Sequence, residues 1–336
     1  MRRSWPRWEI TAPLSCCTPR AGRISFGRMS PLVSIRKPPR LRKGDRVRLV
    51  APASPFDRKL MRQGCERIRS LGLEPVVDRE EFQRRGFLAG TDRSRAMRLV
   101  AALHEEQSKA VWFIRGGYGS CRVLDLVRPN PAAYPPKLLI GFSDITFLLM
   151  TFAAPGGFVT VHGPVVTQLP RLGRSSFSWL KKLLFDDWAE ATVPLGNTRT
   201  IRGGRVRGFL YGGNLSIIAS MAGTGFLPPL AGSILFIEDT GEPAYRLDRM
   251  LMQLKCSGAF ENVMGVVVGR FEGCSPAGGR YSARRVVEDF VAEMGIPAIS
   301  NAGFGHGRVN TALPIGLLAE LDADRGRLDL LEPAFR

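Results

Sequence analysis

Short apolar runs alternate with amphipathic segments from Asp45 onward, and this alternation constrains the fold more than any other feature. Four runs have the length and composition of buried strands: 46–51, 73–77, 109–114 and 137–140. Four segments repeat apolar residues at helical spacing: 57–71, 93–105, 123–127 and 144–152. Strands that alternate with helices in this way form a parallel sheet with helices on both faces. We therefore expect the first half of the chain to fold as an α/β domain. In the second helix the expected inward residues are Met97, Leu99, Val100 and Leu103.

The second half of the chain is richer in glycine and in β-prone residues. Segments 233–237 and 263–268 read as strands with an amphipathic helix at 245–254 between them, and 317–331 reads as a hairpin that turns at 324–326. Segment 170–205 has mixed charge and few inward repeats. We expect four parts: a basic N-terminal extension (1–40), a nucleophile-bearing α/β domain (41–170), a linker (171–205) and a β-rich C-terminal domain (206–336).

The first 28 residues differ from the rest of the sequence. They mix tryptophan, proline and scattered arginine without a period of 2 or 3.6, and they lack the apolar core and cleavage site of a secretory signal. Their arginine and serine content is also compatible with an organelle transit peptide. Met29 is followed directly by proline-rich sequence that leads into the first strand. The hypothesis we prefer is that Met29 is the initiator, and otherwise the extension is disordered.

Composition narrows the classes of protein. No apolar run reaches the roughly 20 residues needed to cross a bilayer, so we expect no membrane partner. The net charge of +18 comes from arginines spread along the chain, without a zinc-finger or RNA-recognition signature, so we expect no nucleic-acid partner and allow for an anionic small substrate. The six cysteines form no C-x-x-C pair, which indicates neither a disulfide framework nor a zinc site and favours the cytoplasm.

A serine follows the fourth predicted strand at a sharp turn into a helix. In open parallel sheets the reacting groups gather at the carboxyl ends of strands, and a serine at such a turn has the arrangement of a nucleophile elbow. Segment 138–146 places Ser143 at this turn, although the second glycine of G-x-S-x-G is absent. The alternative is that Ser143 only caps the helix. As a nucleophile it would use the helix N-terminus, including the N–H of Asp144, for a developing oxyanion.

A glycine-rich loop at 115–119 follows the third predicted strand. Glycine allows the backbone to approach a ligand closely or to adopt a positive φ, so one N–H of this loop could complete an oxyanion hole. The loop could equally be a tight turn without a ligand. Its spacing matches neither the dinucleotide fingerprint nor the Walker P-loop.

A serine nucleophile needs a base, and the chain has three histidines. His104 lies beside two glutamates in a predicted helix and is expected at the surface, whereas His162 follows an apolar strand and could be structural. His306 lies in a loop between glycines, which core packing does not explain, and is preferred as the base. The base in turn needs a carboxylate, and Glu238 and Asp239 both follow an apolar strand.

Together these segments resemble the LD-carboxypeptidase family (serine peptidase family S66), which includes microcin-C immunity peptidases. The resemblance runs from about residue 38 to 331 and rests on motifs in order: Val50–Ser54, Arg115–Gly119, Gly141–Asp144, Tyr211–Asn214, Phe236–Asp239 and Gly305–His306. It implies a flavodoxin-like parallel-sheet domain followed by a β-rich α/β domain, with the active site between them.

The same resemblance implies catalysis by a Ser-Glu-His triad, without a metal or an organic cofactor. Ser143 matches the nucleophile, Glu238 the acid and His306 the base, and the backbone N–H groups of Gly117 and Asp144 match the oxyanion hole. The implied substrate is the murein tetrapeptide, which would lose its terminal D-alanine during peptidoglycan recycling. The resemblance also suggests a homodimer.

Segment 238–249 looks like the murein-recycling branch of the family. The nearest alternative is a microcin-type peptidase that cleaves an aminoacyl- or peptidyl-nucleotide amide. A non-catalytic binding protein on the same scaffold is a further alternative, because one fold hosts many functions. The presence of a serine, a glutamate and a histidine at all three motif positions argues against it.

Overall fold

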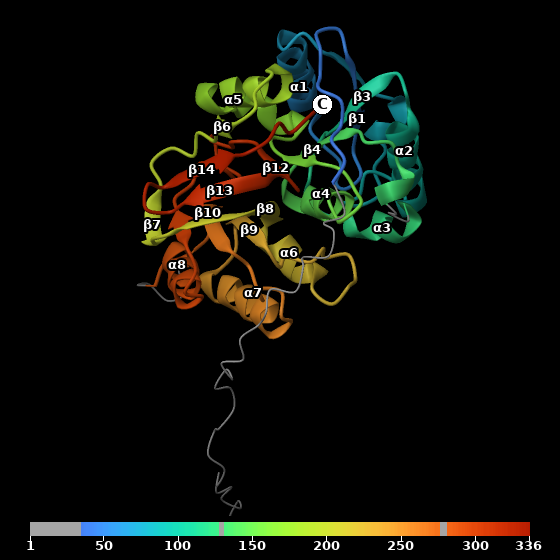
Figure 1. Cartoon of the computed structure of the whole chain (residues 1–336). Coiled ribbons are helices and arrows are strands. Elements are labelled where there is room, and N and C mark those ends of the chain that lie inside the picture. The colour runs from blue at the N-terminus through green and yellow to red at the C-terminus, as the bar shows by residue number, and fades with distance from the viewer. Residues whose placement is uncertain (1–34, 128–130, 276–280) are drawn as a thin grey trace, which may run out of the picture. The chain divides into compact units, whose positions relative to one another are not determined.

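Two β-sheets and the helices that pack on them form the described part of the chain (Figure 1). The computed structural model describes residues 35–127, 131–275 and 281–336. The predicted N-terminal extension, with the proposed start at Met29, lies almost entirely outside these residues. Residues 33–336 cluster as one compact unit. No helix in the described ranges is both long and apolar enough to cross a membrane.

The first sheet has six strands in the order β12-β5-β4-β3-β1-β2. Its strands are β1 (Arg46–Val50), β2 (Glu74–Val76), β3 (Ser108–Phe113), β4 (Leu138–Gly141), β5 (Thr160–His162) and β12 (Leu313–Ile315). β1 to β5 are parallel, and β12 joins β5 antiparallel. The predicted parallel sheet is therefore confirmed. β12 belongs to it although it lies far along the chain.

Helices that mostly bury one apolar face surround this sheet, although the helix at Thr146–Phe152 is buried at every position. They are α1 (Arg58–Ser70), α2 (Asp92–His104), α3 (Cys121–Val127), α4 (Thr146–Phe152) and α5 (Arg174–Phe185). Short 3-10 segments lie at Arg79–Phe82 (η1), Pro131–Ala133 (η2), Ser143–Ile145 (η3) and Val166–Arg171 (η4). The expected inward position of Met97 is wrong, because its side chain is 62% exposed. The buried face of α2 instead includes Arg95, Leu99 and Leu103.

The second sheet has eight strands in the order β6-β14-β13-β8-β9-β10-β11-β7. They are β6 (Ala191–Thr192), β7 (Arg199–Arg202), β8 (Arg205–Asn214), β9 (Ser233–Thr240), β10 (Gly265–Glu272), β11 (Ala298–Ser300), β13 (Leu318–Asp322) and β14 (Arg327–Leu330). β8 to β11 are parallel, and the outer strands are antiparallel. The predicted hairpin is confirmed as β13 and β14. Segment 171–205 contributes α5, β6 and β7.

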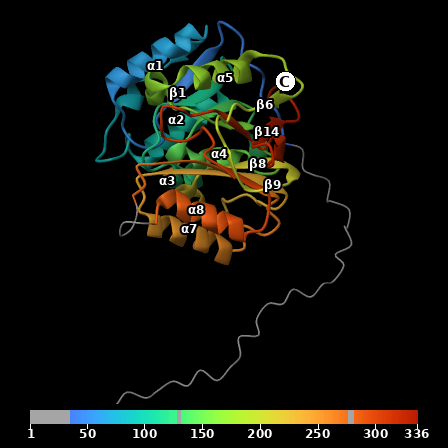
Figure 2. The same ribbon diagram turned by 90° about the vertical axis from the view of Figure 1, so that its left-hand side faces the viewer.

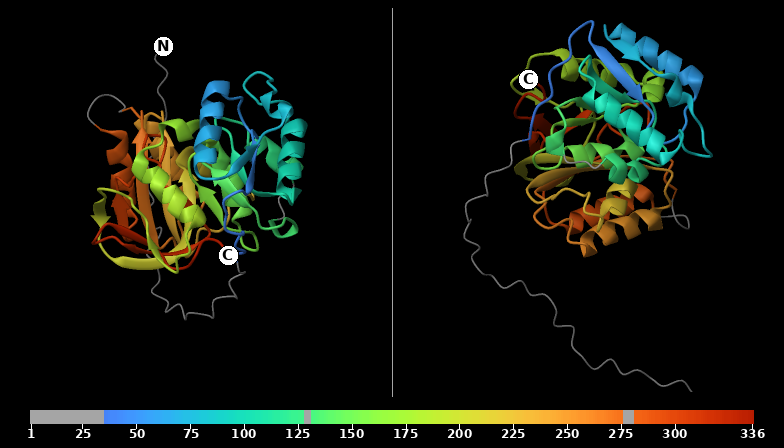
Figure 3. Two further views of the ribbon diagram at one scale, coloured as in Figure 1. Left: turned by 90° about the horizontal axis from the view of Figure 1, so that it is seen from above. Right: turned by 90° about the vertical axis from the view of Figure 1, so that its right-hand side faces the viewer.

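Three helices pack against this second sheet: α6 (Leu215–Met221), α7 (Ala244–Cys256) and α8 (Ala283–Glu293). Figure 2 shows α7 and α8 side by side beneath the strands, and the views in Figure 3 agree. The predicted helix at 245–254 is thus confirmed as α7. The C-terminal residue is tied to the start of the described chain, because Arg336 N donates to Pro38 O at 3.0 Å and Arg40 N donates to Arg336 O at 2.9 Å.

Candidate active site

His306 connects Ser143 and Glu238, although the three residues come from different parts of the chain. Its Nε2 lies 3.0 Å from Ser143 Oγ, and its Nδ1 lies 2.7 Å from Glu238 Oε2. Both distances are hydrogen-bond distances. This is the arrangement in which an imidazole accepts a proton from a hydroxyl while a carboxylate fixes its tautomer. The structure therefore brings together the three residues that the sequence singled out.

Ser143 lies in a strained turn at the end of β4. Its φ is +64°, in the left-handed region that costs a non-glycine residue free energy. η3 begins at Ser143 and leads directly into α4. The structure does not show Ser143 as a helix cap: Phe142 is the N-cap residue of η3, and the Ser143 hydroxyl meets His306 instead. The turn holds this hydroxyl clear of the strand, as in a nucleophile elbow.

The 115–119 loop packs against Ser143. A Cβ on Gly116 would lie 3.0 Å from Ser143 Cβ and 3.3 Å from Asp144 N, so only glycine allows this approach. Gly117 has a φ of +93°. Within the described residues, the backbone N–H groups of Gly117 and Asp144 donate no hydrogen bond. Two free N–H groups beside a serine hydroxyl are suited to binding a developing oxyanion.

Side chains hold this loop in place. The Asp144 carboxylate accepts hydrogen bonds from Gly119 N at 3.3 Å and Ser120 N at 2.8 Å. Arg95, which is fully buried, donates to the carbonyl oxygens of Gly119 at 2.7 Å and of Pro52. The guanidinium therefore ties the 115–119 loop to the segment after β1. Sequence reasoning missed Arg95 because an arginine in a helix normally reads as a surface residue.

Glu238 and Asp239 have separate tasks at the end of β9. Glu238 is fully buried and contacts His306, with Asn214 Nδ2 3.4 Å from its Oε1. Asp239 accepts hydrogen bonds from Asn214 Nδ2 at 3.0 Å and from Ser216 N at 2.8 Å. Its carboxylate therefore fixes the start of α6. The strand pattern in the sequence does not distinguish Glu238 from Asp239. In the structure, Glu238 is the acid that contacts His306.

The close approach of β8 to α4 brings Ser143 and Glu238 together. Asn214 N donates to Thr146 Oγ1 at 3.1 Å, just after the serine turn. Gly213 has a φ of +147°, and a Cβ on it would lie 2.6 Å from Thr146 Oγ1. A side chain at this position would therefore push the helix away from β8. β8 pairs with β9, so this contact sets the distance from the turn to Glu238.

The loop that carries His306 is fixed from both sides. A Cβ on Gly305 would lie 3.0 Å from Glu238 Oε2, which leaves little room for any other residue. Gln168 Nε2 donates to the carbonyl oxygen of Gly307 at 3.2 Å, and its Oε1 accepts from Asn310 Nδ2 at 2.9 Å. Sequence reasoning did not find Gln168 or Asn310, because amide side chains that bind distant backbone leave no local pattern.

The charge of Glu238 controls the protonation of His306. Burial alone would lower the pKa of the imidazole, because a low-dielectric environment disfavours its charged form. The negative charge of Glu238 and its hydrogen bond, together with the charges of Asp239 and Glu272, outweigh burial, so the pKa of His306 is raised above its ordinary value of 6.5. The carboxylate of Glu238 would also stabilise the imidazolium that forms when His306 takes a proton.

The other two histidines have different environments. His104 is exposed at the end of α2, as the sequence predicts. His162 is fully buried among the rings of Phe142, Phe236 and Phe304, and neither of its ring nitrogens has a hydrogen-bond partner among the described residues. Burial lowers the pKa of His162 to about 4, so its imidazole is neutral near pH 7.

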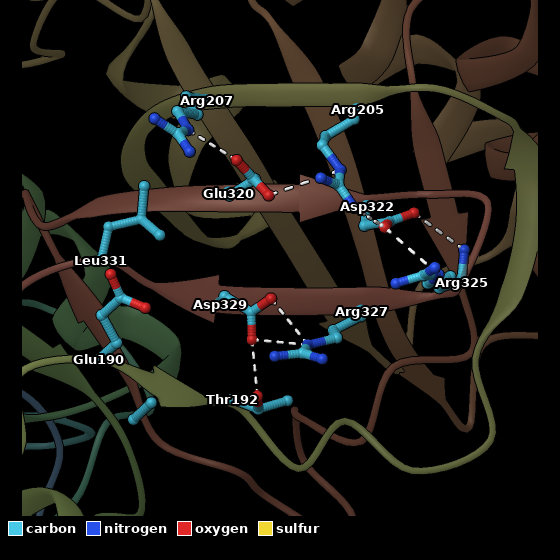
Figure 4. Close-up of a pocket in the computed structure, with 11 residues that line it drawn as sticks. Glu190, Thr192, Arg205, Arg207, Glu320, Asp322, Arg325, Arg327, Asp329 and Leu331 are labelled. Atoms are coloured by element: carbon cyan, nitrogen blue, oxygen red, sulfur yellow. Dashed lines mark hydrogen bonds and ion pairs between the residues drawn. The ribbon is translucent and has the colours of Figure 1, made fainter.

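Two surface hollows differ in how their charges are arranged. A cavity of about 590 Å³ is lined by His306 and by residues from η4 and the ends of β9 and β10. A second pocket, of about 470 Å³, lies on the face of β8, β13 and β14 and contains no triad residue (Figure 4). Its arginines pair with carboxylates of the same face, as Arg207 does with Glu320 at 2.6 Å. The cavity beside His306 is therefore the candidate substrate site.

Comparison with known families identifies two matching domain models. The family model of the LD-carboxypeptidase N-terminal domain matches residues 47–163, and that of the LD-carboxypeptidase C-terminal domain matches residues 207–321. The first range contains Ser143 and the second contains Glu238 and His306. The two matches together span more than half of the chain.

Individual relatives cover nearly the whole chain. The murein tetrapeptide carboxypeptidase of Pseudomonas aeruginosa is 36% identical over 297 residues, 84% of this chain and 94% of that protein. The crystal structure of a muramoyltetrapeptide carboxypeptidase from Oxalobacter formigenes has a TM-score of 0.72 at 27% identity and covers 84% of this chain and 98% of its own. The microcin C7 self-immunity protein of Escherichia coli is 23% identical over 312 residues, 84% of this chain and 91% of that protein. The resemblance seen in the sequence is thus confirmed: the chain belongs to the LD-carboxypeptidase family of serine peptidases.

Proposed function

We propose that this chain is a serine-type LD-carboxypeptidase that releases the terminal D-alanine from a murein tetrapeptide. The observation that carries the proposal is the position of His306, within hydrogen-bond distance of both Ser143 Oγ and Glu238 Oε2. The similarity to the murein tetrapeptide carboxypeptidase of Pseudomonas aeruginosa supports the choice of substrate.

In the proposed reaction, Ser143 Oγ attacks the carbonyl carbon of the last peptide bond while His306 takes the hydroxyl proton. The N–H groups of Gly117 and Asp144 bind the oxyanion of the tetrahedral intermediate. His306 then protonates the amine of D-alanine, which departs and leaves an acyl-enzyme. Water, activated by the same imidazole, hydrolyses this ester and regenerates Ser143. Glu238 keeps the Nδ1 proton in place throughout.

The test is release of D-alanine from purified murein tetrapeptide by the wild type and by a Ser143→Ala variant. We expect kcat to fall by about 10⁴-fold or more in the variant, because members of a triad act as a unit. Circular dichroism and the melting temperature of both proteins serve as the control for folding. A folded wild type that releases no D-alanine would contradict the proposal.

The second candidate is a microcin-type activity on an aminoacyl- or peptidyl-nucleotide amide. The likeness to the microcin C7 self-immunity protein favours it, and the same triad could attack that amide. A peptidyl-adenylate analogue assayed beside the murein peptide separates the two, and a higher kcat/KM for the analogue would support this candidate.

The cytoplasm and a homodimer remain parts of the proposal. The cytoplasm is supported by the cysteines, since Cys65, Cys121, Cys256 and Cys274 are all free thiols. The homodimer rests on the family resemblance. Fractionation of the native host and light scattering of the purified protein measure the two properties.

A further inference from the structure

The cavity beside His306 holds three charged side chains that the triad does not use. They are Arg171, Glu272 and Arg308, and all three are exposed. A volume of about 590 Å³ is in the range of small-molecule and peptide-end sites. Because His306 forms part of the wall, a molecule bound in this cavity lies directly beside the proposed reaction centre.

None of these three side chains has an ion-pair or hydrogen-bond partner within the part of the chain that the structure describes. The contrast with the pocket of Figure 4 is clear, because there Arg205, Arg207 and Arg327 all pair with carboxylates. Charges that neutralise one another stabilise a sheet face and leave little for a ligand. Charges without internal partners, gathered around a reaction centre, are available to a charged substrate.

Glu272 is held close to the loop that carries His306. It ends β10, and its carbonyl oxygen accepts hydrogen bonds from Gly241 N and Thr240 Oγ1, both at 2.9 Å. Its Oε1 lies 2.5 Å from the place that a Cβ on Gly307 would occupy. The backbone is thus anchored while the carboxylate reaches the residue next to His306. A substrate ammonium is the natural partner for such a carboxylate.

The two arginines come from neighbouring segments. Gly173 N donates to the carbonyl oxygen of Arg308 at 2.8 Å, and Arg171 lies two residues earlier at the end of η4. Guanidinium groups bind carboxylates through paired, charge-assisted hydrogen bonds. His306 must hand its proton to the departing amine, so the residue that leaves, with its terminal carboxylate two bonds from that amine, lies beside His306. Arg308 is two residues from His306 along the chain.

We propose that this cavity is a charge-reading subsite for the peptide end, in which Glu272 binds an ammonium and Arg171 and Arg308 bind carboxylates. The inference rests on the proposed peptidase function and goes beyond it, because it assigns the recognition of the substrate to three residues outside the triad. The class of ligand is a peptide whose last residue has a free carboxylate and whose preceding residue carries a side-chain ammonium.

The test for Glu272 compares two murein-type tetrapeptides that differ only in the third residue, lysine or norleucine. We expect the wild type to favour the lysine peptide in kcat/KM by about 10-fold or more, the size of one charge-assisted hydrogen bond. In Glu272→Gln this ratio should fall below about twofold, and in the control Glu293→Gln, an exposed carboxylate on α8, it should stay at the wild-type value. A ratio that Glu272→Gln leaves unchanged would overturn the assignment.

The test for the arginines compares the lysine peptide ending in D-alanine with the same peptide ending in D-alaninamide. The wild type should favour the free acid by about 10- to 100-fold in kcat/KM. Arg171→Gln and Arg308→Gln together should remove most of this preference, while Arg93→Gln, an exposed arginine of α2, should retain it. Retention of the full acid-to-amide ratio in the double variant would overturn the assignment.

A binding measurement separates failure of this subsite from failure of the proposed function. Calorimetry on Ser143→Ala protein reads the affinity for the same peptides without turnover. If Glu272→Gln in that background weakens binding of the lysine peptide and not that of the norleucine peptide, the subsite stands even where the wild type releases no D-alanine. Equal affinities for the two peptides in the Ser143→Ala protein overturn the subsite, whatever the activity of the wild type.

Discussion

The imidazole of His306 and the carboxylate of Glu238 meet at 2.7 Å, and the carboxylate has no exposed surface. A fully buried carboxylate depends on its partners for stabilisation, so each of the two groups holds the other in place. Burial would lower the pKa of His306, but this interaction is the largest of the carboxylate effects that together raise it. Both kcat and the pKa of His306 should therefore depend on the charge of Glu238 as well as on its shape.

Replacement of Glu238 by glutamine keeps the volume and removes the charge. We expect kcat for D-alanine release to fall by about 10³- to 10⁴-fold, because a neutral amide no longer stabilises the imidazolium or enforces the tautomer. The pKa of His306 should fall as well, since burial is then opposed only by the weaker effects of the Asp239 and Glu272 charges. Nitrogen-15 spectra of the imidazole in wild type and Glu238→Gln measure this shift. An unchanged pKa would show that Glu238 does not govern the base.

The pH dependence of kcat/KM in the wild type follows from the interaction between His306 and Glu238. The base must be neutral in order to accept the serine proton, so kcat/KM should rise with pH through the pKa of His306. Because that pKa is raised, the acid limb should lie above pH 6.5. The charge of Glu272 also raises it, so Glu272→Gln should move the limb to lower pH. A limb below pH 6.5 in the wild type would contradict this.

Because the backbone at Ser143 is strained, two substitutions that both abolish activity should differ in their effect on stability. Both Ser143→Ala and Ser143→Gly remove the nucleophile, but only glycine adopts a φ of +64° without steric cost. The left-handed conformation costs about 1–2 kcal/mol, and the greater freedom of glycine in the unfolded chain offsets about 0.5–1 kcal/mol of that. Urea unfolding should therefore find Ser143→Gly more stable than Ser143→Ala by roughly 0.5–1 kcal/mol. Equal stabilities would mean that the turn relaxes when the hydroxyl is lost.

Gly117 and Gly44 offer a matched pair for testing the proposed oxyanion role of the Gly117 N–H. Their φ values are +93° and +88°, so an alanine strains the backbone equally at both. A Cβ on Gly117 would lie 2.5 Å from Ser54 Oγ, whereas a Cβ on Gly44 meets nothing within 4 Å. Gly117→Ala should displace its N–H and lower kcat by about 10²- to 10³-fold. Gly44→Ala carries the same backbone strain without this clash and should keep its kcat, and equal activities of the two variants would argue against a role for Gly117.

The sequence predicted the site better than it predicted the surroundings of the site. Ser143 and His306 follow strands and Glu238 lies near the end of one, but these strands belong to two sheets, and the contact of β8 with α4 brings the sheets together at the site. Reacting groups gather at the carboxyl ends of parallel strands, which marks each of the three residues separately. That rule needs only local patterns. Gln168 and Asn310 act through bonds to residues more than 130 positions away, so nothing near them in the sequence marks them. For the same reason, the sequence does not indicate that Arg171, Glu272 and Arg308 line one cavity.

The fold shows the same division between local pattern and distant contact. Strands β1, β2, β3, β4, β9 and β10 lie within a few residues of the predicted bounds, whereas the sequence analysis gives no bounds for β5 and β8. β6 and β7 are edge strands of two and four residues with mostly exposed side chains, so segment 171–205 shows no strand pattern. In α2, Met97 lies two residues from both Arg95 and Leu99, which puts it on the opposite side of the helix. The buried arginine concealed the true inward face.

His162 gives a prediction about stability rather than activity. Its folded pKa of about 4 lies below the unfolded value of 6.5, so the unfolded chain binds the extra proton between these two values. The contribution of neutral His162 is therefore complete above pH 6.5 and is lost as the pH falls toward 4. The difference between the two values amounts to about 3 kcal/mol.

A His162→Leu variant should lack this pH dependence, because leucine fits the aromatic surroundings without a proton to bind. We expect the free energy of unfolding of the wild type, relative to the variant, to fall by up to about 3 kcal/mol between pH 7.5 and pH 4. Urea unfolding of both proteins at intervals of half a pH unit measures the two curves. Parallel curves for the wild type and His162→Leu would show that His162 binds its proton equally well in the folded and in the unfolded chain.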